Sequence, residues 1–469
     1  ATVPSFFSFN NISKNGANTK AEQAGYIDNN QAVFATFQLG YKSWAYLDLT
    51  ARNDWFSTLA NTDNEKSGFF YPSVGVSAVV SEMFDLSKAY ISFLKFRASY
   101  SEVGNPPMRQ ITMPTYTVKD GIVNTSSRLL NPDLKPERTK SVEIGMNLRM
   151  FQNLLNIDFT YYNSNTYNQF INYTMPPSTG YSNYMLNGGK VNNWGIEARL
   201  GIDANLGPVK WNSNLTFTMN RNKVVYLLPG GATNPITGEP ISITEIEPFN
   251  PQGSYKMIVK EGGTLSDIYV TGLKIDYLGN IKVDANTGAI EADPNTWIKA
   301  GSAAPRFNWG WNNSFSWKGI NLSFLIDARI GGVGVSATQA KMDYYGTSKT
   351  SAIVRDNGGV NLNSGRVTAK DYYNVLGNGA TGVLANYVYS MTNVRLREAT
   401  LGYTFPTKWF GNQIQNLTVS LIGKNLFMFH NKAPFDPELS ASTGTYYQGF
   451  DYFMQPSVRS IGFSVKFQY

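Results

Sequence analysis

The sequence predicts an all-β protein, with about 13 strands that form part of a transmembrane antiparallel β-barrel. Three observations predict it. The C-terminal stretch alternates strictly between apolar and polar residues, the composition is aromatic-rich and charge-poor, and the connections between strand-like segments alternate between short and long along the chain.

The C-terminal strand, Arg459 to Tyr469, has the clearest pattern. One face carries Ile461, Phe463, Val465, Phe467 and Tyr469. The other face, from Ser460 to Gln468, is polar or small. Successive side chains of a strand point to opposite faces, so this strand suits a position between lipid and a polar lumen. A strand of a soluble sandwich shows the same pattern, so this stretch does not decide the fold alone.

Composition narrows the class of protein. The chain has 28 Tyr, 28 Phe and 9 Trp but only 16% charged residues, which is typical of aromatic girdles around a sparsely charged lipid belt. It has no cysteine and one histidine, His430, so thiol, zinc and Ser-His chemistry are excluded or confined to that residue. No apolar run of about 20 residues predicts a membrane helix. The net charge of +7 is spread along the chain, which argues against nucleic-acid binding.

Strand-like alternation begins after residues 1–31, which are polar and irregular. In the first strands, alternate residues are apolar and share one face, for example from Val33 to Tyr41, Leu47 with Leu49, and Val74 with Val76. Tight turns mark the ends of the later strands. The thirteen predicted strands are 32–41, 43–52, 68–80, 92–104, 140–150, 154–164, 192–203, 209–222, 304–317, 319–330, 392–405, 414–425 and 459–469.

The connections fall into two alternating classes. Short ones lie near 42, 81–91, 151–153, 204–208, 318 and 406–413, and long ones are 53–67, 105–139, 165–191, 223–303, 331–391 and 426–458. Outer-membrane barrels have this layout, with short periplasmic turns and long extracellular loops, whereas sandwiches and propellers follow no such rule. Aromatic residues beside short turns, such as Trp44, Trp317 and Trp409, fit interfacial girdles.

The odd number of strands suggests a larger assembly, because bacterial single-chain barrels have an even number. If the last strand ends in the periplasm, strand 32–41 also runs inward and residues 1–31 lie outside the cell. We therefore expect residues 1–469 to be the C-terminal part of a larger barrel.

Motifs in a fixed order over roughly residues 90–469 resemble one family. They are LKFRASY (94–100), VGN (103–105), NPDLKPERT (131–139), NWGIE (193–197), PRF (305–307), IGG (330–332), VRLREATLGYTFP (394–406), GKNL (423–426) and DPE (436–438). In this order they resemble the SusC-like (SusC/RagA family) TonB-dependent outer-membrane transporters of Bacteroidetes.

The resemblance implies a roughly 22-stranded barrel with a plug. The family's plug and first strands have no counterpart in this chain. It further implies import of glycan oligosaccharides or peptides, with a SusD-like surface lipoprotein as lid. TonB-ExbB-ExbD would supply the energy through the missing N-terminal region. Dimers of SusC–SusD pairs would lie in membrane lipid and lipopolysaccharide. No enzyme activity, cofactor or metal is expected.

Candidate cargo contacts are aromatic clusters in the long loops. They are Tyr344, Tyr345, Tyr372, Tyr373, Tyr446, Tyr447, Phe450, Asp451 and Tyr452. Tyrosine rings stack on sugars or pack against peptides, and their hydroxyls form hydrogen bonds. The same clusters also suit loop-on-loop packing or a partner protein.

No catalytic constellation is predicted. Asp158, Glu197 and Asp327 lie on polar strand faces without a geometry for acid–base catalysis, so we interpret them as lumen electrostatics. The stretch 276–294, with Asp284, has too few carboxylates at alternate positions for a calcium loop.

Two other functions remain open from the sequence. A passive porin would form a complete even-stranded barrel within this length. An extracellular glycan-binding or hydrolase domain would be soluble and would carry a spaced carboxylate pair. The sequence does not separate glycan from peptide cargo.

Overall fold

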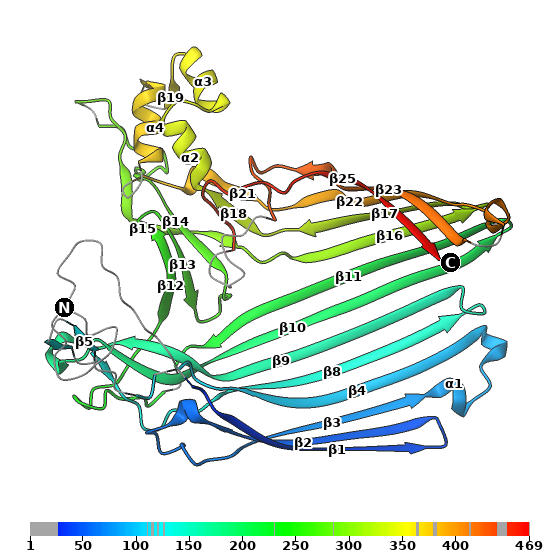
Figure 1. The fold of residues 1–469 in the computed structure, drawn as a ribbon. Coiled ribbons are helices and arrows are strands. Elements are labelled where there is room, and N and C mark those ends of the chain that lie inside the picture. The colour runs from blue at the N-terminus through cyan, green and yellow to red at the C-terminus, as the bar shows by residue number, and fades with distance from the viewer. Residues whose placement is uncertain are drawn as a thin grey trace, which may run out of the picture.

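One curved antiparallel sheet dominates the computed structural model (Figure 1), which describes residues 27–468 except 110, 114–116, 120–121, 125–126, 229, 285, 363–364, 379–381, 412–413 and 439–447. Thirteen strands follow each other in chain order: β1 (Asn30–Tyr41), β2 (Ala45–Phe56), β3 (Phe69–Val79), β4 (Ile91–Asn105), β8 (Glu137–Met150), β9 (Leu155–Thr174), β10 (Asn183–Leu206), β11 (Val209–Tyr226), β16 (Phe307–Trp317), β17 (Ile320–Ile330), β22 (Asn393–Thr404), β23 (Gln415–Asn431) and β25 (Ser460–Gln468). The short β7 (Arg128–Leu129) pairs with β10 in parallel.

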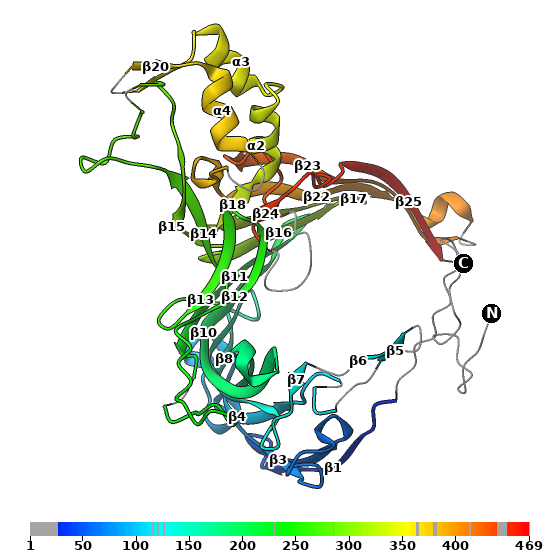
Figure 2. The same cartoon turned by 90° about the vertical axis from the view of Figure 1, so that its left-hand side faces the viewer.

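The sheet curls into an open C when viewed along its strands (Figure 2). β1 and β25 form its two edges, and each pairs with one neighbour among the described residues. The predicted class, an antiparallel barrel sheet of thirteen strands, is confirmed. The described strands do not close the barrel.

Tight turns join the strands at one end of the sheet, on the right in Figure 1. Lys42 and Ser43 between β1 and β2, and Phe151 to Asn153 between β8 and β9, all have positive φ angles. Consecutive left-handed residues match the right-handed twist of the flanking strands, so such turns keep a hairpin in register. Two longer connections at this end contain short helices: α1 (Val80–Met83) and η3 (Ser87–Ala89) between β3 and β4, and η6 (Thr407–Phe410) between β22 and β23.

The opposite end carries the long connections, and one of them corrects the sequence prediction. The expected loop 165–191 is mostly strand, because the β9–β10 ladder continues through Asn165↔Asn192 to Thr174↔Asn183. Only residues 175–182, with η4 (Pro177–Thr179), connect the two strands. This stretch mixes asparagine and glycine with scattered apolar residues such as Ile171 and Leu186, which are buried. It therefore shows no regular alternation although its backbone pairs as in any strand.

Three long loops fold together into a unit that we call the loop domain. Residues 227–306 form the sheet β12 (Glu245–Gln252), β13 (Tyr255–Lys260), β14 (Asp267–Leu273), β15 (Ala292–Ser302). Residues 331–392 form β18 (Val333–Ser336), α2 (Ala337–Tyr344), α3 (Lys349–Asp356), β19 (Val360–Leu362), β20 (Gly365–Val367), α4 (Ala369–Gly377), η5 (Ala385–Tyr387) and β21 (Val388–Ser390). The loop 432–459 adds β24 (Phe450–Asp451), which pairs in parallel with β18. Smaller elements elsewhere are η2 (Ser57–Leu59), β5 (Thr117–Lys119) and β6 (Ile122–Asn124).

The largest hydrophobic core lies in this loop domain and not between layers of the barrel sheet. Tyr255, Ile268, Val335, Leu376 and Phe450 belong to one buried cluster drawn from all three loops. Helices α2, α3 and α4 each begin after a serine or threonine whose side chain accepts a backbone N–H of the first turn, which stabilises these short helices.

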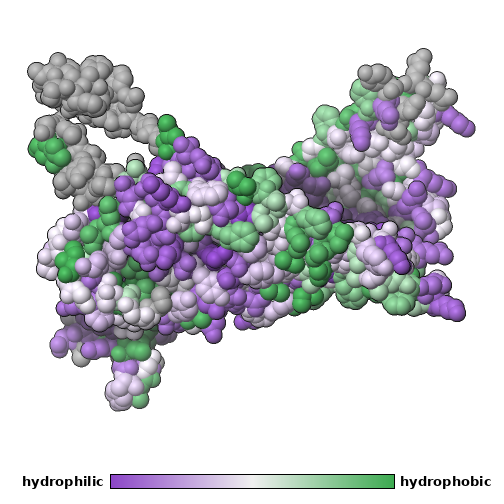
Figure 3. Space-filling view, turned by 90° about the horizontal axis from the view of Figure 1, so that it is seen from below, coloured by the Kyte–Doolittle hydropathy of each residue, from purple (hydrophilic) through white to green (hydrophobic). Residues whose placement is uncertain are grey.

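The barrel strands instead expose their apolar side chains. Val76, Phe96, Ile144, Leu401 and Phe463 are all exposed on one face, where a water-soluble sheet would bury them. Seen from below in Figure 3, hydrophobic residues gather toward the short-turn end and hydrophilic ones toward the long loops. This distribution fits a lipid belt. Within the described residues, no helix is long and apolar enough to cross a membrane.

Candidate functional site

The face of the sheet opposite the apolar belt forms a polar inner wall. Arg97 on β4 reaches over β8 to Asp158 on β9, at 3.0 Å, and donates to Asn147 Oδ1 at 2.6 Å. Gly145 makes this reach possible, because a Cβ there would lie 2.5 Å from Arg97 Nε. The wall is therefore cross-linked by hydrogen bonds between strands.

Amide side chains cover the wall toward the long loops. Asn222 donates to Asn193 Oδ1 at 2.8 Å, and Asn220 donates to the same oxygen at 3.4 Å. An amide offers both donors and an acceptor. Such a surface can bind the hydroxyls of a sugar or the backbone of a peptide.

A buried ion pair attaches the loop 432–459 to the inner wall. Arg395 on β22 is 2% exposed and donates to Asp436 Oδ1 at 2.8 Å. A carboxylate oxygen of Glu438 lies 3.4 Å from Arg395 Nε and 2.5 Å from Arg397 Nη2. Arg397 also forms an ion pair with Asp327 on β17, at 2.6 Å. The structure thus joins the two sequence motifs that contain Arg395 and Asp436. The sequence shows both motifs, at 394–406 and 436–438, but does not indicate that they are in contact.

This ion pair predicts an acid-sensitive loop. Burial raises the pKa of Asp436, but hydrogen bonds from Arg395 and Ser457 outweigh it and lower the pKa from 3.8 to about 2. Because the pKa in the folded state lies below that of the unfolded chain, the pair stabilises the docked loop above about pH 4 and loses this effect as the pH falls toward 2. We expect pepsin to cut loop 432–459 at pH 2 but not at pH 4. Asp436→Asn should be cut at both, and equal protection of wild type at both pH values would contradict the prediction.

The predicted cargo-contact residues differ in how accessible the structure makes them. Tyr373 and Phe450 are buried in the loop-domain core, and Asp451 is buried with its carboxylate accepting from Ser336 Oγ at 2.5 Å. These three hold the loops together. Tyr345 and Tyr452 are exposed, so cargo contact stays a prediction for them.

The other predicted aromatics are less accessible or lie outside the described part. Tyr344 and Tyr372 are half-buried, packed edge-on against Tyr345 and Tyr373 with ring centroids 5.0 and 5.3 Å apart. Burial raises the pKa of Tyr373 to about 12, with Asp343 adding to the shift, so this hydroxyl stays protonated at neutral pH. Tyr446 and Tyr447 lie outside the described residues.

Asp284 lies in the stretch that the sequence predicts not to bind calcium. Its carboxylate accepts the backbone N–H groups of Asn286 and Thr287 and stabilises a turn. Among the described residues, no three His, Cys, Asp or Glu side chains gather to hold a metal ion.

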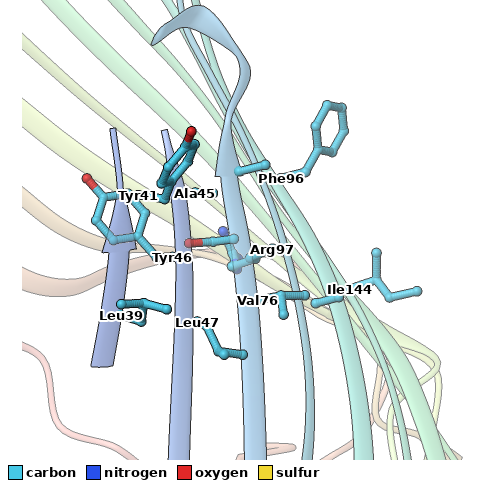
Figure 4. A pocket seen from close by; sticks show the side chains of 12 residues that line it. Leu39, Tyr41, Ala45, Tyr46, Leu47, Val76, Phe96, Arg97 and Ile144 are labelled. Carbon is cyan, nitrogen blue, oxygen red and sulfur yellow. The ribbon is translucent and has the colours of Figure 1, made fainter. Parts of the chain in front are cut away.

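One apolar groove lies on the belt and not on the inner wall. It has a volume of about 590 Å³ and crosses β1 to β4 and β8 (Figure 4). Leu39, Val76, Phe96 and Ile144 line it, and Ala45 and Ala78 leave it hollow. Such a surface suits acyl chains. Two other cavities, of about 420 and 490 Å³, lie along the inner wall of β10, β11, β16 and β17.

Comparisons with known proteins agree with this architecture. The sequence model of the family described as TonB dependent receptor-like, beta-barrel, matches residues 3–245. The chain belongs to this family, whose members are outer-membrane proteins. This confirms the predicted fold class and the resemblance to TonB-dependent transporters.

The chain is similar to curated receptors from one organism and to solved structures of an importer. The chain is 26% identical to TonB-dependent receptor P26 of Formosa agariphila over 98% of its length and 24% identical to receptor P3 of that organism over 96%. It covers 48% and 47% of these proteins, so it spans about half the length of the curated relatives it matches. The RagAB peptide importer in the open-open state shares the fold, with a TM-score of 0.70 and 18% identity over 93% of this chain and 47% of that chain. Another RagAB peptide transporter structure matches with a TM-score of 0.62 and 19% identity, over 86% of this chain and 44% of that chain.

Proposed function

We propose that this chain forms the wall and loop domain of an active outer-membrane importer for peptides or oligosaccharides. The observation that carries the proposal is the folded loop domain, which has its own core and stands at the long-loop end of a polar inner wall. A passive porin needs only an open lumen, whereas such a platform suits the docking of a lid. A SusD-like surface lipoprotein would be that lid, and TonB-ExbB-ExbD would supply the energy.

The open sheet supports a larger barrel. β1 and β25 each have one edge without a partner among the described strands, and backbone groups exposed to lipid are too costly to leave unpaired. We propose that further strands close the barrel, that a plug fills it, and that the loop domain faces the cell exterior. The loops 53–67 and 105–139 would lie on the same side.

The inner wall and the relatives support a proposed class of cargo. Amide-rich surfaces suit both peptides and oligosaccharides. RagAB is a peptide importer, which supports peptides as the first class to test. No step of bond chemistry is part of this function.

Uptake by intact cells tests the proposal. We expect a strain that lacks the gene for the complete polypeptide to lose uptake of a fluorescent peptide or oligosaccharide mixture, and re-expression to restore it. A protonophore should abolish this uptake, because TonB-driven transport depends on the proton gradient. Uptake that persists in the protonophore would favour a passive porin instead.

A further inference from the structure

One row of inner-wall residues carries opposite charges at its two ends. The register pairs Glu197 on β10 with Thr218 on β11, Thr218 with Asn308 on β16, and Asn308 with Arg329 on β17. The four residues therefore stand side by side on adjacent strands. A carboxylate and a guanidinium flank two uncharged hydrogen-bonding side chains.

Neither charged end has an opposite charge in contact. Among the described residues, no basic group lies within 4.0 Å of the Glu197 carboxylate and no acidic group within 4.0 Å of the Arg329 guanidinium. Arg329 donates to the carbonyl of Ala303, yet its buried Nε finds no acceptor in the described structure. Arg329 is half-buried, and a buried charge without a partner is costly, so a ligand carboxylate that pairs with it binds favourably. Glu197 is exposed and can meet a cation from the lumen.

The charged residues near Glu197 and Arg329 do not form ion pairs with them. Asp327 and Glu438 are the carboxylates closest in the fold to Arg329, and both are held by Arg397. On the other side, Arg199 shares the face of β10 with Glu197 but donates to Asn214 Oδ1 at 2.6 Å. Arg199, Asp327 and Glu438 are thus engaged elsewhere. Arg221 and Arg306 line the same cavity as Glu197, and Glu438 lines the same cavity as Arg329, but none of them forms an ion pair with either end of the row.

Two cavities lie along this row and meet at its centre. Glu197 lines the cavity of about 490 Å³, and Arg329 lines the cavity of about 420 Å³. Thr218 and Asn308 line both, and neither side chain has a hydrogen-bond partner among the described residues. Gly310 widens the second cavity, because a Cβ there would lie 3.0 Å from Thr216 Oγ1.

We propose that this row binds a short zwitterionic peptide across the strands, with its amino terminus at Glu197 and its carboxylate at Arg329. Strands lie roughly 4.8 Å apart, so three spacings separate the backbones of Glu197 and Arg329 by roughly 14 Å. An extended peptide advances about 3.3–3.6 Å per residue, so about four residues span the row. A neutral oligosaccharide has no charge to match either end. The inference rests on the proposed import function and narrows its cargo to peptides with free termini.

Binding of tetra-alanine to the detergent-purified complete polypeptide, with its lid, tests the row by calorimetry. Three probes are compared: the free tetrapeptide, its N-acetylated form and its C-amidated form. We expect amidation to weaken binding to wild type by about tenfold, the scale of a lost charge-assisted hydrogen bond. In Arg329→Gln, the free and amidated peptides should bind equally, and Arg329→Lys should restore part of the difference. In Glu197→Gln, the free and acetylated peptides should bind equally.

Matched variants and further outcomes separate the two proposals. Arg199→Gln and Glu143→Gln change inner-wall charges outside the row and should leave all three affinities unchanged. Heat-modifiable migration on gels checks that each variant is folded. Equal wild-type affinity for free and blocked peptides would overturn the row proposal while leaving peptide import intact. Arg329-dependent binding of a uronate oligosaccharide, without peptide binding, would also overturn it. Failure of every peptide and oligosaccharide to bind would overturn the proposed function itself.

Discussion

Ile144→Arg is expected to destabilise the barrel by about 2–4 kcal/mol, the cost of an arginine on the lipid face near the middle of the bilayer. Ile144 is exposed on the apolar face of β8 and lines the groove in Figure 4. Its position six residues before the short turn at Met150 places it well within the belt. Urea titration of the complete polypeptide refolded into lipid vesicles measures the change.

The neighbouring residue provides the control for this prediction. Glu143 points to the inner wall, so Glu143→Arg should change the unfolding free energy by less than about 1 kcal/mol. If both substitutions cost the same, the apolar face of the sheet does not contact lipid. A loss of unfolding free energy in Ile144→Arg alone would show that the apolar face of the sheet contacts lipid.

Asp436→Ala is expected to release the loop 432–459 from the inner wall. It leaves Arg395, which is 2% exposed, without its main carboxylate partner, and breaking one half of a buried pair costs about 3–5 kcal/mol. Limited proteolysis at neutral pH should cut the loop rapidly in the variant and slowly in wild type. Because β24 in this loop pairs with β18, the loop domain should lose protection as well.

Two further variants separate the charge from the packing. Replacing both partners, Arg395→Met with Asp436→Leu, removes the unpaired charge and should restore much of the protection. Asp356→Ala removes one half of the exposed pair with Arg355 and should cost no more than about 1 kcal/mol. Slow cleavage of Asp436→Ala would show that the ion pair does not hold the loop.

The loop aromatics show where sequence reasoning stops. A tyrosine or phenylalanine in a polar loop suits cargo binding, but Tyr373 and Phe450 are core residues here. Their partners, such as Tyr255 and Val335, come from loops separated by long stretches of chain. No local pattern marks a core that three irregular segments build together.

The sequence by itself determined the number of barrel strands and the two-sided layout of the connections, but not the extension of β9 and β10 through 165–191 or the elements inside the long loops. This was possible because lipid on one face and water on the other impose a period of two on each strand independently. Only the tertiary structure decided which residues meet across strands and loops. Arg395 with Asp436, and the row from Glu197 to Arg329, depend on register and on loop folding. Such contacts join residues that are distant in the chain, so no local spacing encodes them.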